Sequence, residues 1–276
     1  MKILGHVVGA MYLWAIALLT LLAVVSGYTL HLFPWALISA VASAVVADIL
    51  ISRFHHKHKL RIPFSAIITG LIVGSVAPHN APVALAVLAS LVAILAKNFV
   101  RVRRVNVFNP AALGLIVALA LFSMGDEWWA AGSFNVYGVA ISLAPILIVS
   151  AYQARRLTAS LSFAIASVGI AIAANLGYLS SLGGVAALLF SANYYMAFIM
   201  VAEPKTSPHK RLPQAVFGAG VAVGIAVFAM AGAPYPSLLA LLIGNIAYTG
   251  YRIRPQKSVH QHVVEEAVAR PAAAAQ

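Results

Sequence analysis

Ten long apolar runs divide the chain and leave little room for anything else. They lie near residues 10–27, 33–52, 64–77, 82–97, 111–124, 135–153, 159–176, 183–201, 213–231 and 234–250. A helix needs about 20 apolar residues to cross a bilayer, so ten such spans use most of the 276 residues. Only 9% of the residues are charged, against about 25% in a typical soluble domain. The pattern predicts an all-α integral membrane protein with about ten transmembrane helices.

The placement of the 18 Lys and Arg residues predicts how the chain is threaded. If the N-terminus starts in the cytoplasm, all 18 fall on the cytoplasmic side of the predicted spans, whereas Asp126 and Glu127 fall on the other side. Cytoplasmic loops are enriched in Lys and Arg, so both termini are expected in the cytoplasm (N-in, C-in). This orientation accounts for the net charge of +12 through contact with the lipid bilayer, without a nucleic-acid partner.

An internal repeat is indicated by three prolines that share one offset. Pro78, Pro82 and Pro110 fall on Pro204, Pro208 and Pro236 when the sequence is shifted by 126 positions. Accidental proline spacing is the alternative. Each half has five predicted spans, and an odd number places the second half upside down, as in inverted-repeat transporters. We therefore expect a single transmembrane domain over 1–257, with repeats at about 1–125 and 126–257, followed by a disordered tail at 258–276.

In inverted-repeat folds the functional site lies where the halves meet, at short or Pro-interrupted segments. Two such segments are 77–82 and 203–208. A third is the predicted helix start at Asn109-Pro110, where Asn caps the helix and Pro suits its first turn. A helix start of this kind presents backbone N–H groups to a ligand.

At these segments the sequence resembles the NqrB/RnfD family. The resemblance is carried by SAIITGL at 65–71, AKN at 96–98 and NVFNPAALG at 106–114, and again from Phe198 through EPKTSP at 203–208 to Gly218. It implies ten helices in two inverted halves, and a membrane subunit of an ion-translocating electron-transfer complex. The relatives are the sodium-pumping NADH:quinone oxidoreductase and the Rnf ferredoxin:NAD oxidoreductase. It also implies a multi-pass protein of the prokaryotic cytoplasmic (inner) membrane, with other membrane or soluble redox subunits as partners.

The resemblance further implies a set of cofactor-binding residues at the matching positions: Thr69, Lys97, Asn98, Asn106, Phe108, Asn109, Pro110, Gly114, Thr206 and Ser207. Members with covalent FMN attach it to the Thr of a Ser-Gly-Ala-Thr motif after the fifth span. Here residues 125–133 contain no Thr, so covalent FMN is not expected and a noncovalent flavin (riboflavin or FMN) is. The chain has no cysteine, which excludes iron–sulfur clusters held by this chain, and no facing pair of deep histidines suggests haem.

Two carboxylates are candidates for an ion or proton pathway. Asp48 lies inside a predicted span, where acidic residues are costly and often functional; an interfacial pair with Arg53 one turn away is the alternative. Glu203 stands where family members usually carry Asp, beside Lys205. Its expected role is to coordinate a cation or to orient its loop.

Other motifs have simpler explanations. The His-rich run at 55–59 contains two Lys residues that would repel a metal ion, so a solvated basic loop is expected and no metal site. Trp128-Trp129 are expected to anchor the chain at the membrane interface, with stacking on a flavin as the alternative. No hydrolase triad, P-loop or dinucleotide fingerprint is present, so no catalytic residue is assigned and nicotinamide chemistry belongs to a partner.

Three functions remain open from the sequence. The first is an electron-transfer subunit that binds a flavin or a quinone. The second is a channel or carrier for a small solute or ion on the same scaffold, because a fold does not fix a function. The third is a scaffold that docks redox partners.

Overall fold

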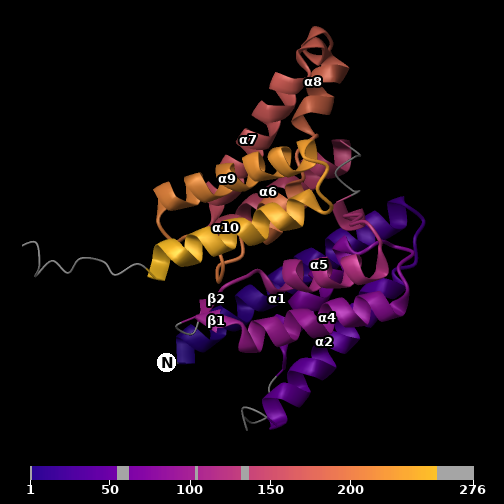
Figure 1. Ribbon diagram of the computed structural model, residues 1–276, viewed down its shortest axis with the longest axis vertical. Coiled ribbons are helices and arrows are strands. Elements are labelled where there is room, and N and C mark those ends of the chain that lie inside the picture. The colour runs from indigo at the N-terminus through magenta and orange to yellow at the C-terminus, as the bar shows by residue number, and fades with distance from the viewer. Residues whose placement is uncertain (1, 55–61, 103–104, 132–136, 254–276) are drawn as a thin grey trace, which may run out of the picture.

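The computed structural model describes residues 2–54, 62–102, 105–131 and 137–253, and these form a helical bundle (Figure 1). The helices are α1 (Lys2–Thr29), α2 (Trp35–Phe54), α3 (Phe64–Val76), α4 (Val83–Phe99), α5 (Pro110–Phe122), α6 (Tyr137–Gln153), α7 (Leu157–Ala174), α8 (Leu182–Leu189), α9 (Arg211–Met230) and α10 (Pro236–Ile253). A 3-10 turn, η2 (Leu176–Ser180), precedes α8, and a π-helical turn, η3 (Met196–Met200), follows it. Two short strands, β1 (Arg101–Val102) and β2 (Val105–Asn106), pair antiparallel between α4 and α5.

The predicted span at 183–201 is wrong, because the structure breaks it into two pieces. Helix α8 ends at Leu189, and the chain resumes a helical path only after Asn193. The side chain of Asn193 accepts a hydrogen bond from the backbone N–H of Met196 at 2.8 Å, so it starts a new turn in the manner of a helix cap. Because Asn193 lies within a largely apolar run, hydropathy alone did not reveal it as a capping residue. The other nine predicted spans each coincide with one helix; eight agree to within a few residues at both ends, and α1 begins eight residues before the span predicted at 10–27.

Four helices among the described residues are long and apolar enough to cross a membrane by themselves. They comprise Ala10–Thr29 within α1, all of α2, α7 and α9. Helix α3 has 13 residues, and at about 1.5 Å per residue it is shorter than a hydrocarbon core of about 30 Å. Val76 and Ala77 at its end are fully buried. The structure therefore supports a helical membrane protein in which the short helix α3 ends among buried residues.

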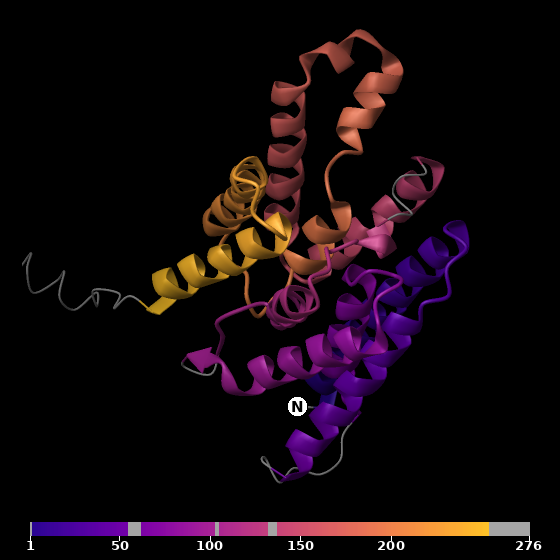
Figure 2. The same cartoon turned by 45° about the vertical axis from the view of Figure 1, so that its right-hand side comes forward.

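The helices pack with the same neighbours in each half of the chain. In the first half α2 contacts α3 and α4, α4 contacts α5, and α1 contacts α3. In the second half α7 contacts η3 and α9, α9 contacts α10, and α6 contacts η3. The two halves form separate groups in Figures 1 and 2, and they meet where α1 contacts α6 and α5 contacts α10. Helices α1 and α6 are the first helices of their halves, and α5 and α10 are the last helices.

Glycine allows the closest helix pairs to form. A Cβ atom at Gly114 in α5 would lie 2.1 Å from the carbonyl oxygen of Ala89 in α4. A Cβ atom at Gly218 in α9 would lie 2.2 Å from the carbonyl oxygen of Ala159 in α7. Small residues at such crossings let backbones approach in membrane bundles, so these glycines fix the helix pairs on which the site is built.

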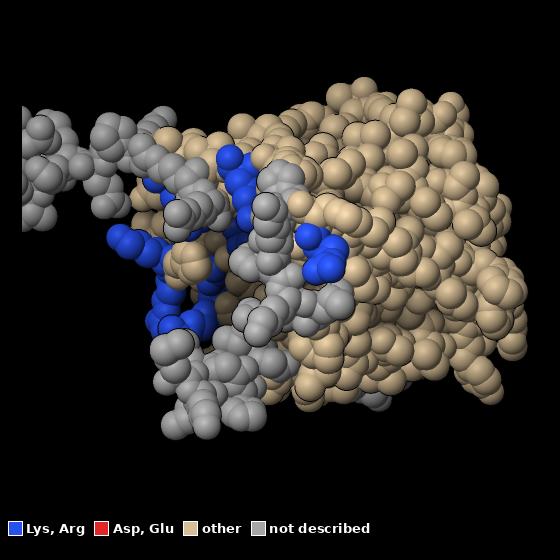
Figure 3. All heavy atoms as spheres, turned by 90° about the horizontal axis from the view of Figure 1, so that it is seen from below, with Lys and Arg blue, Asp and Glu red and all other residues tan. Residues whose placement is uncertain are grey.

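The basic residues gather at one end of the molecule. Arg53, Lys97 and Arg252 lie in the last turns of α2, α4 and α10, and Arg211 begins α9. Figure 3 shows Lys and Arg at this end, while the rest of the face in view shows neither basic nor acidic side chains. This arrangement agrees with the segregation of charge expected from the sequence.

Candidate functional site

A cavity of 340 Å³ lies between the two halves, towards the basic end of the bundle. It is bounded by α1, α3, the first turn of α5, the end of α6 and the segment from Phe198 to Lys205. Its walls are mostly apolar, and its polar lining residues are Tyr12, Ser65, Thr69, Asn109, Ser150, Gln153, Glu203 and Lys205. Three segments that the sequence singled out, near 65–69, 109–111 and 203–205, thus line one space.

The first turn of α5 is built as the sequence predicts. The side-chain oxygen of Asn109 accepts a hydrogen bond from the backbone N–H of Ala112 at 3.1 Å, and Pro110 occupies the first helical turn. Asn109 is 1% exposed, so its own backbone N–H needs a partner inside the protein. The side-chain oxygen of Asn245 in α10 supplies that partner at 2.8 Å.

Asn245 connects this turn to the loop of the other half. Its amide nitrogen donates to the carbonyl oxygen of Thr206 at 3.2 Å, and the residue is fully buried. One side chain therefore ties the Asn109 turn to the 203–208 loop. Sequence reasoning missed Asn245; the available signal was an amide inside an apolar span, where polar side chains commonly bond between helices.

The loop after η3 is held by its own hydroxyl groups. The Thr206 hydroxyl donates to the Glu203 carboxylate at 3.0 Å, and the Ser207 hydroxyl donates to the Glu203 carbonyl oxygen at 2.6 Å. Burial raises the pKa of the Glu203 carboxyl, while the Thr206 hydrogen bond and then Lys205 and Lys97 lower it. The residue as a whole keeps some exposure, so the carboxyl is enclosed at the cavity wall and not in the core.

A buried arginine braces this loop from the other side. Arg156, at the start of α7, is 2% exposed. Its guanidinium donates to the Ser207 hydroxyl at 2.8 Å, to the Pro204 carbonyl oxygen at 2.9 Å and to Nδ1 of His209 at 2.9 Å. Because Arg donates only, Nδ1 of His209 must be the accepting nitrogen. Burial, and then Arg156 and Arg252, lower the pKa of His209. From the sequence, Arg156 was expected only to contribute to the orientation of the chain in the membrane.

Asp48 pairs with Lys97, not with Arg53. The Lys97 ammonium lies 3.1 Å from the Asp48 carboxylate, joining α4 to α2, whereas Arg53 is exposed. The interfacial pair considered from the sequence thus has a different partner. The same lysine is close enough to influence Glu203 electrostatically, which places the two acidic candidates near one shared cation.

The remaining predicted site residues divide into three groups. Thr69 and Pro110 line the cavity together with Asn109 and Glu203. Thr206 and Ser207 hold Glu203 in the wall, and Lys97 pairs with Asp48. Four others lie away from the lining: Asn98 bonds within α4, Asn106 is buried in β2, Phe108 packs against the core and Gly114 packs against α4. The structure brings together about half of the residues that the resemblance implied.

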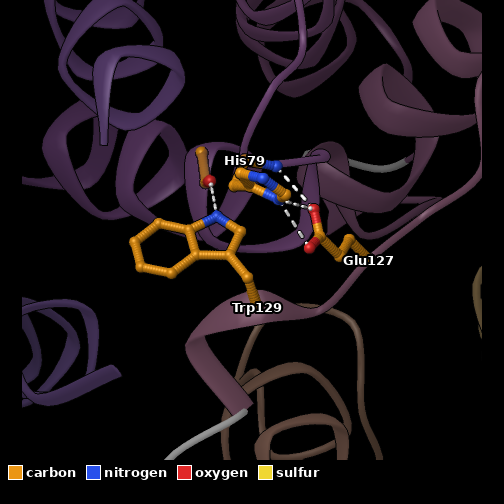
Figure 4. A network of polar contacts seen from close by, with 4 residues as sticks. His79, Glu127 and Trp129 are labelled. Carbon is orange, nitrogen blue, oxygen red and sulfur yellow. Dashed lines mark hydrogen bonds and ion pairs between the residues drawn. The ribbon is translucent and has the colours of Figure 1, made fainter. Parts of the chain in front are cut away.

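A second arrangement of polar groups lies at the opposite end of the bundle, after α5 (Figure 4). The Glu127 carboxylate accepts from the backbone N–H of His79 at 2.6 Å and lies 2.7 Å from its ring nitrogen Nδ1. The Trp129 indole donates to the carbonyl oxygen of Gly74 at 2.7 Å. Trp129 is 3% exposed, so its expected role as an interfacial anchor is wrong: its hydrogen bond pins the 127–131 segment to the end of α3.

Within the part of the chain that the structure describes, no three His, Cys, Asp or Glu side chains cluster in a way that would hold a metal ion. The His-rich run at 55–59 and the tail at 258–276 lie outside the described residues.

Comparison with known families agrees with the resemblance seen in the sequence. Residues 5–133 match the model of the NQR2, RnfD, RnfE family. This segment runs from α1 through α5 to the loop that follows, and includes Thr69, Asn109 and Glu127. No curated protein matches the chain. The resemblance to the NqrB/RnfD family is therefore confirmed over the first half, and with the apolar helices it indicates a multi-pass membrane protein.

Proposed function

We propose that this chain, which matches the NQR2, RnfD, RnfE family over residues 5–133, is a membrane subunit of an Nqr/Rnf-type electron-transfer complex. In this proposal the 340 Å³ cavity holds a noncovalent flavin or a quinone, and electron transfer is coupled to ion translocation. The observation that carries the proposal is the convergence of Thr69, Asn109 and Glu203 on one cavity between the halves.

The lining fits a planar, mostly apolar ring with a polar edge. Its volume lies within the range of about 300–1,000 Å³ common for small-molecule pockets. Leu18, Ile72 and Phe198 supply apolar walls, while Glu203 and Lys205 supply a carboxylate and an ammonium at one side. A flavin or quinone bound there would accept electrons and pass them on. The protein would orient its ring and exclude water.

The architecture that we propose around this cavity is an inverted repeat of about ten spans, N-in and C-in. Its support is the pairing of corresponding helices, α1 with α6 and α5 with α10. Helices α5 and α10 also begin at prolines 126 positions apart, Pro110 and Pro236. The basic end would face the cytoplasm of a prokaryotic cell, with the protein in the cytoplasmic membrane.

Electrons would have to reach this chain from other subunits. The sequence contains no cysteine for an iron–sulfur cluster and no dinucleotide fingerprint. A soluble or membrane-bound redox partner that docks near the basic end would supply them.

The first test is a visible absorption spectrum of the detergent-purified protein, followed by acid precipitation. We expect a flavin band that leaves with the supernatant, or, for a colourless preparation, a quinone in an organic extract. Ser150→Trp should fill the cavity and abolish the bound group, whereas Val149→Trp, at an exposed neighbour, should retain it. A preparation with neither flavin nor quinone, or equal retention by both variants, would contradict the proposal.

A second candidate function is a carrier for a small solute or ion. A further cavity of 380 Å³ lies at the opposite end of the bundle, so two openings approach the junction of the halves from both ends. Solute flux into proteoliposomes that contain no redox group would favour this function. Flux that depends on a bound redox group would favour the first.

A further inference from the structure

The second cavity, independent of the proposed redox site, has a chemical character of its own. Its 380 Å³ are lined by the rings of Trp128, Phe190 and Tyr194 and by Glu127. No Lys or Arg is among its lining residues. Asp126 and Glu127 are both in the loop that forms one wall. His79 contacts the Glu127 carboxylate but does not line the cavity. An anionic ligand would therefore meet negative charge with no Lys or Arg among the described lining residues.

The Ser191 and Tyr194 hydroxyls and the side-chain oxygen of Asn193 already make hydrogen bonds within the protein. The Ser191 hydroxyl donates to the Leu188 carbonyl oxygen at 2.7 Å, and the Asn193 side-chain oxygen accepts from Met196 at 2.8 Å. The Tyr194 hydroxyl donates to the Leu189 carbonyl oxygen. A neutral polar solute would find few groups to bond. The recognition elements that the cavity offers are its aromatic residues and the Glu127 carboxylate, which also contacts His79.

The aromatic wall is held in place before any ligand arrives. Trp128 has φ +54°, a backbone conformation that bulky residues rarely adopt and that tends to occur at functional sites. Its indole N–H donates to Asp126, and its backbone N–H donates to the Val76 carbonyl oxygen. Glu127 is fixed by two contacts to His79 (Figure 4). The ring and the carboxylate thus have set positions at the cavity.

We propose that this cavity binds an organic cation bearing a trimethylammonium group, which Trp128, Phe190 and Tyr194 would enclose beside the Glu127 carboxylate. Such a cation is attracted to ring faces by their quadrupoles, and it needs no hydrogen-bond partner. The group could come from a free solute of the choline type or from a phosphocholine lipid headgroup.

Binding of radiolabelled choline to the full-length protein, immobilised in a maltoside detergent, tests the proposal. We expect saturable binding that unlabelled tetramethylammonium displaces. The neutral isostere 3,3-dimethyl-1-butanol has the same shape without the charge and should not displace it. Competition by a soluble short-chain phosphocholine lipid stronger than that by choline would identify the lipid as the source, and the reverse order would identify the free solute.

Matched variants distinguish a loss of choline recognition from a loss of folding. Trp128→Leu keeps an apolar wall and should weaken choline binding about 3- to 30-fold, the size of a cation–π contact, whereas Trp128→Phe should retain most of it. Glu127→Gln should also weaken binding. If Trp128→Leu fails to fold, Phe190→Leu replaces it. Absence of saturable choline binding, or equal competition by the neutral isostere, would overturn the proposal.

Discussion

The two hydrogen bonds of Asn245 hold the proposed site together, and Asn245→Leu removes both. The backbone N–H of Asn109, 1% exposed, would lose its acceptor at 2.8 Å, and the Thr206 carbonyl would lose its donor at 3.2 Å. An orphaned buried donor costs about 1–3 kcal/mol, while hydrogen bonds between membrane helices average about 0.6 kcal/mol. We therefore expect a loss of about 1–3 kcal/mol.

At about 2–4 °C per kcal/mol for a chain of this size, the apparent melting temperature should fall by about 2–12 °C. Thermal denaturation of the detergent-purified protein measures this shift. Asn175→Leu is the matched control, because the exposed side chain of Asn175 donates to Ala171 in the preceding turn. Its loss should change stability by no more than about 0.5 kcal/mol. Equal shifts for the two variants would refute the role given to Asn245.

Four further outcomes are expected. Glu203→Gln should keep the Thr206 contact and the folded state but impair electron transfer or flux; unchanged activity would remove Glu203 from the mechanism. Gly218→Ala should destabilise the protein by about 1–3 kcal/mol through overpacking, because the new Cβ would meet the Ala159 backbone. The control is Gly220→Ala in the same helix, whose Cβ would meet nothing within 4 Å and which should be neutral or stabilising. The pKa of His209 is lowered in the folded protein, so the unfolded chain binds more protons, and stability should fall as the pH drops below about 6.5. His209→Gln should flatten this pH dependence in a series of melting curves. An unchanged pH dependence would assign the effect to another group. Tags inserted after Ala77 and after Glu203 should be labelled from opposite sides of the membrane, and labelling from one side would contradict the inverted halves.

The sequence predicted the elements whose signals are local. Helix α5 begins at Pro110 because Asn109 caps it. Asn before Pro is a recognisable helix-start signal in the sequence. Hydropathy is also a local signal, and the apolar runs predicted nine of the helices, eight of them to within a few residues at both ends. The run at 183–201 failed because hydropathy does not distinguish a continuous helix from two short ones. Asn193, the residue that restarts the chain, is a single amide among apolar neighbours.

The sequence predicted which segments form the site, but not the hydrogen bonds that join those segments. The sequence singled out Thr69 and Asn109 as cofactor-binding candidates and Glu203 as an ion-pathway candidate, and the structure places all three on one cavity. The sequence offered no hint of Asn245 or Arg156, which hold the neighbouring segments in place. Asn245 bonds the backbone N–H of Asn109 in the first half and the carbonyl oxygen of Thr206 in its own half, and Arg156 bonds the carbonyl oxygen of Pro204 in its own half. A bond to a backbone group leaves no pattern of residue types at its other end. Such contacts appear only once the chain is folded.

The cavities at the two ends of the bundle differ in the charge of their lining residues, and this difference bears on the direction in which a cation would move. At the basic end, Lys205 lines the cavity beside Glu203, and Lys97 and Arg156 lie behind its wall. At the other end, a carboxylate and aromatic rings line the cavity and no basic residue does. A cation would therefore be attracted at the acidic end and opposed at the basic end unless Glu203 is ionised. Burial raises the pKa of the Glu203 carboxyl, and a change in its charge state would alter that opposition. In the electron-transfer function proposed above, we therefore propose Glu203 as the group through which a redox event in the first cavity would act on ion passage.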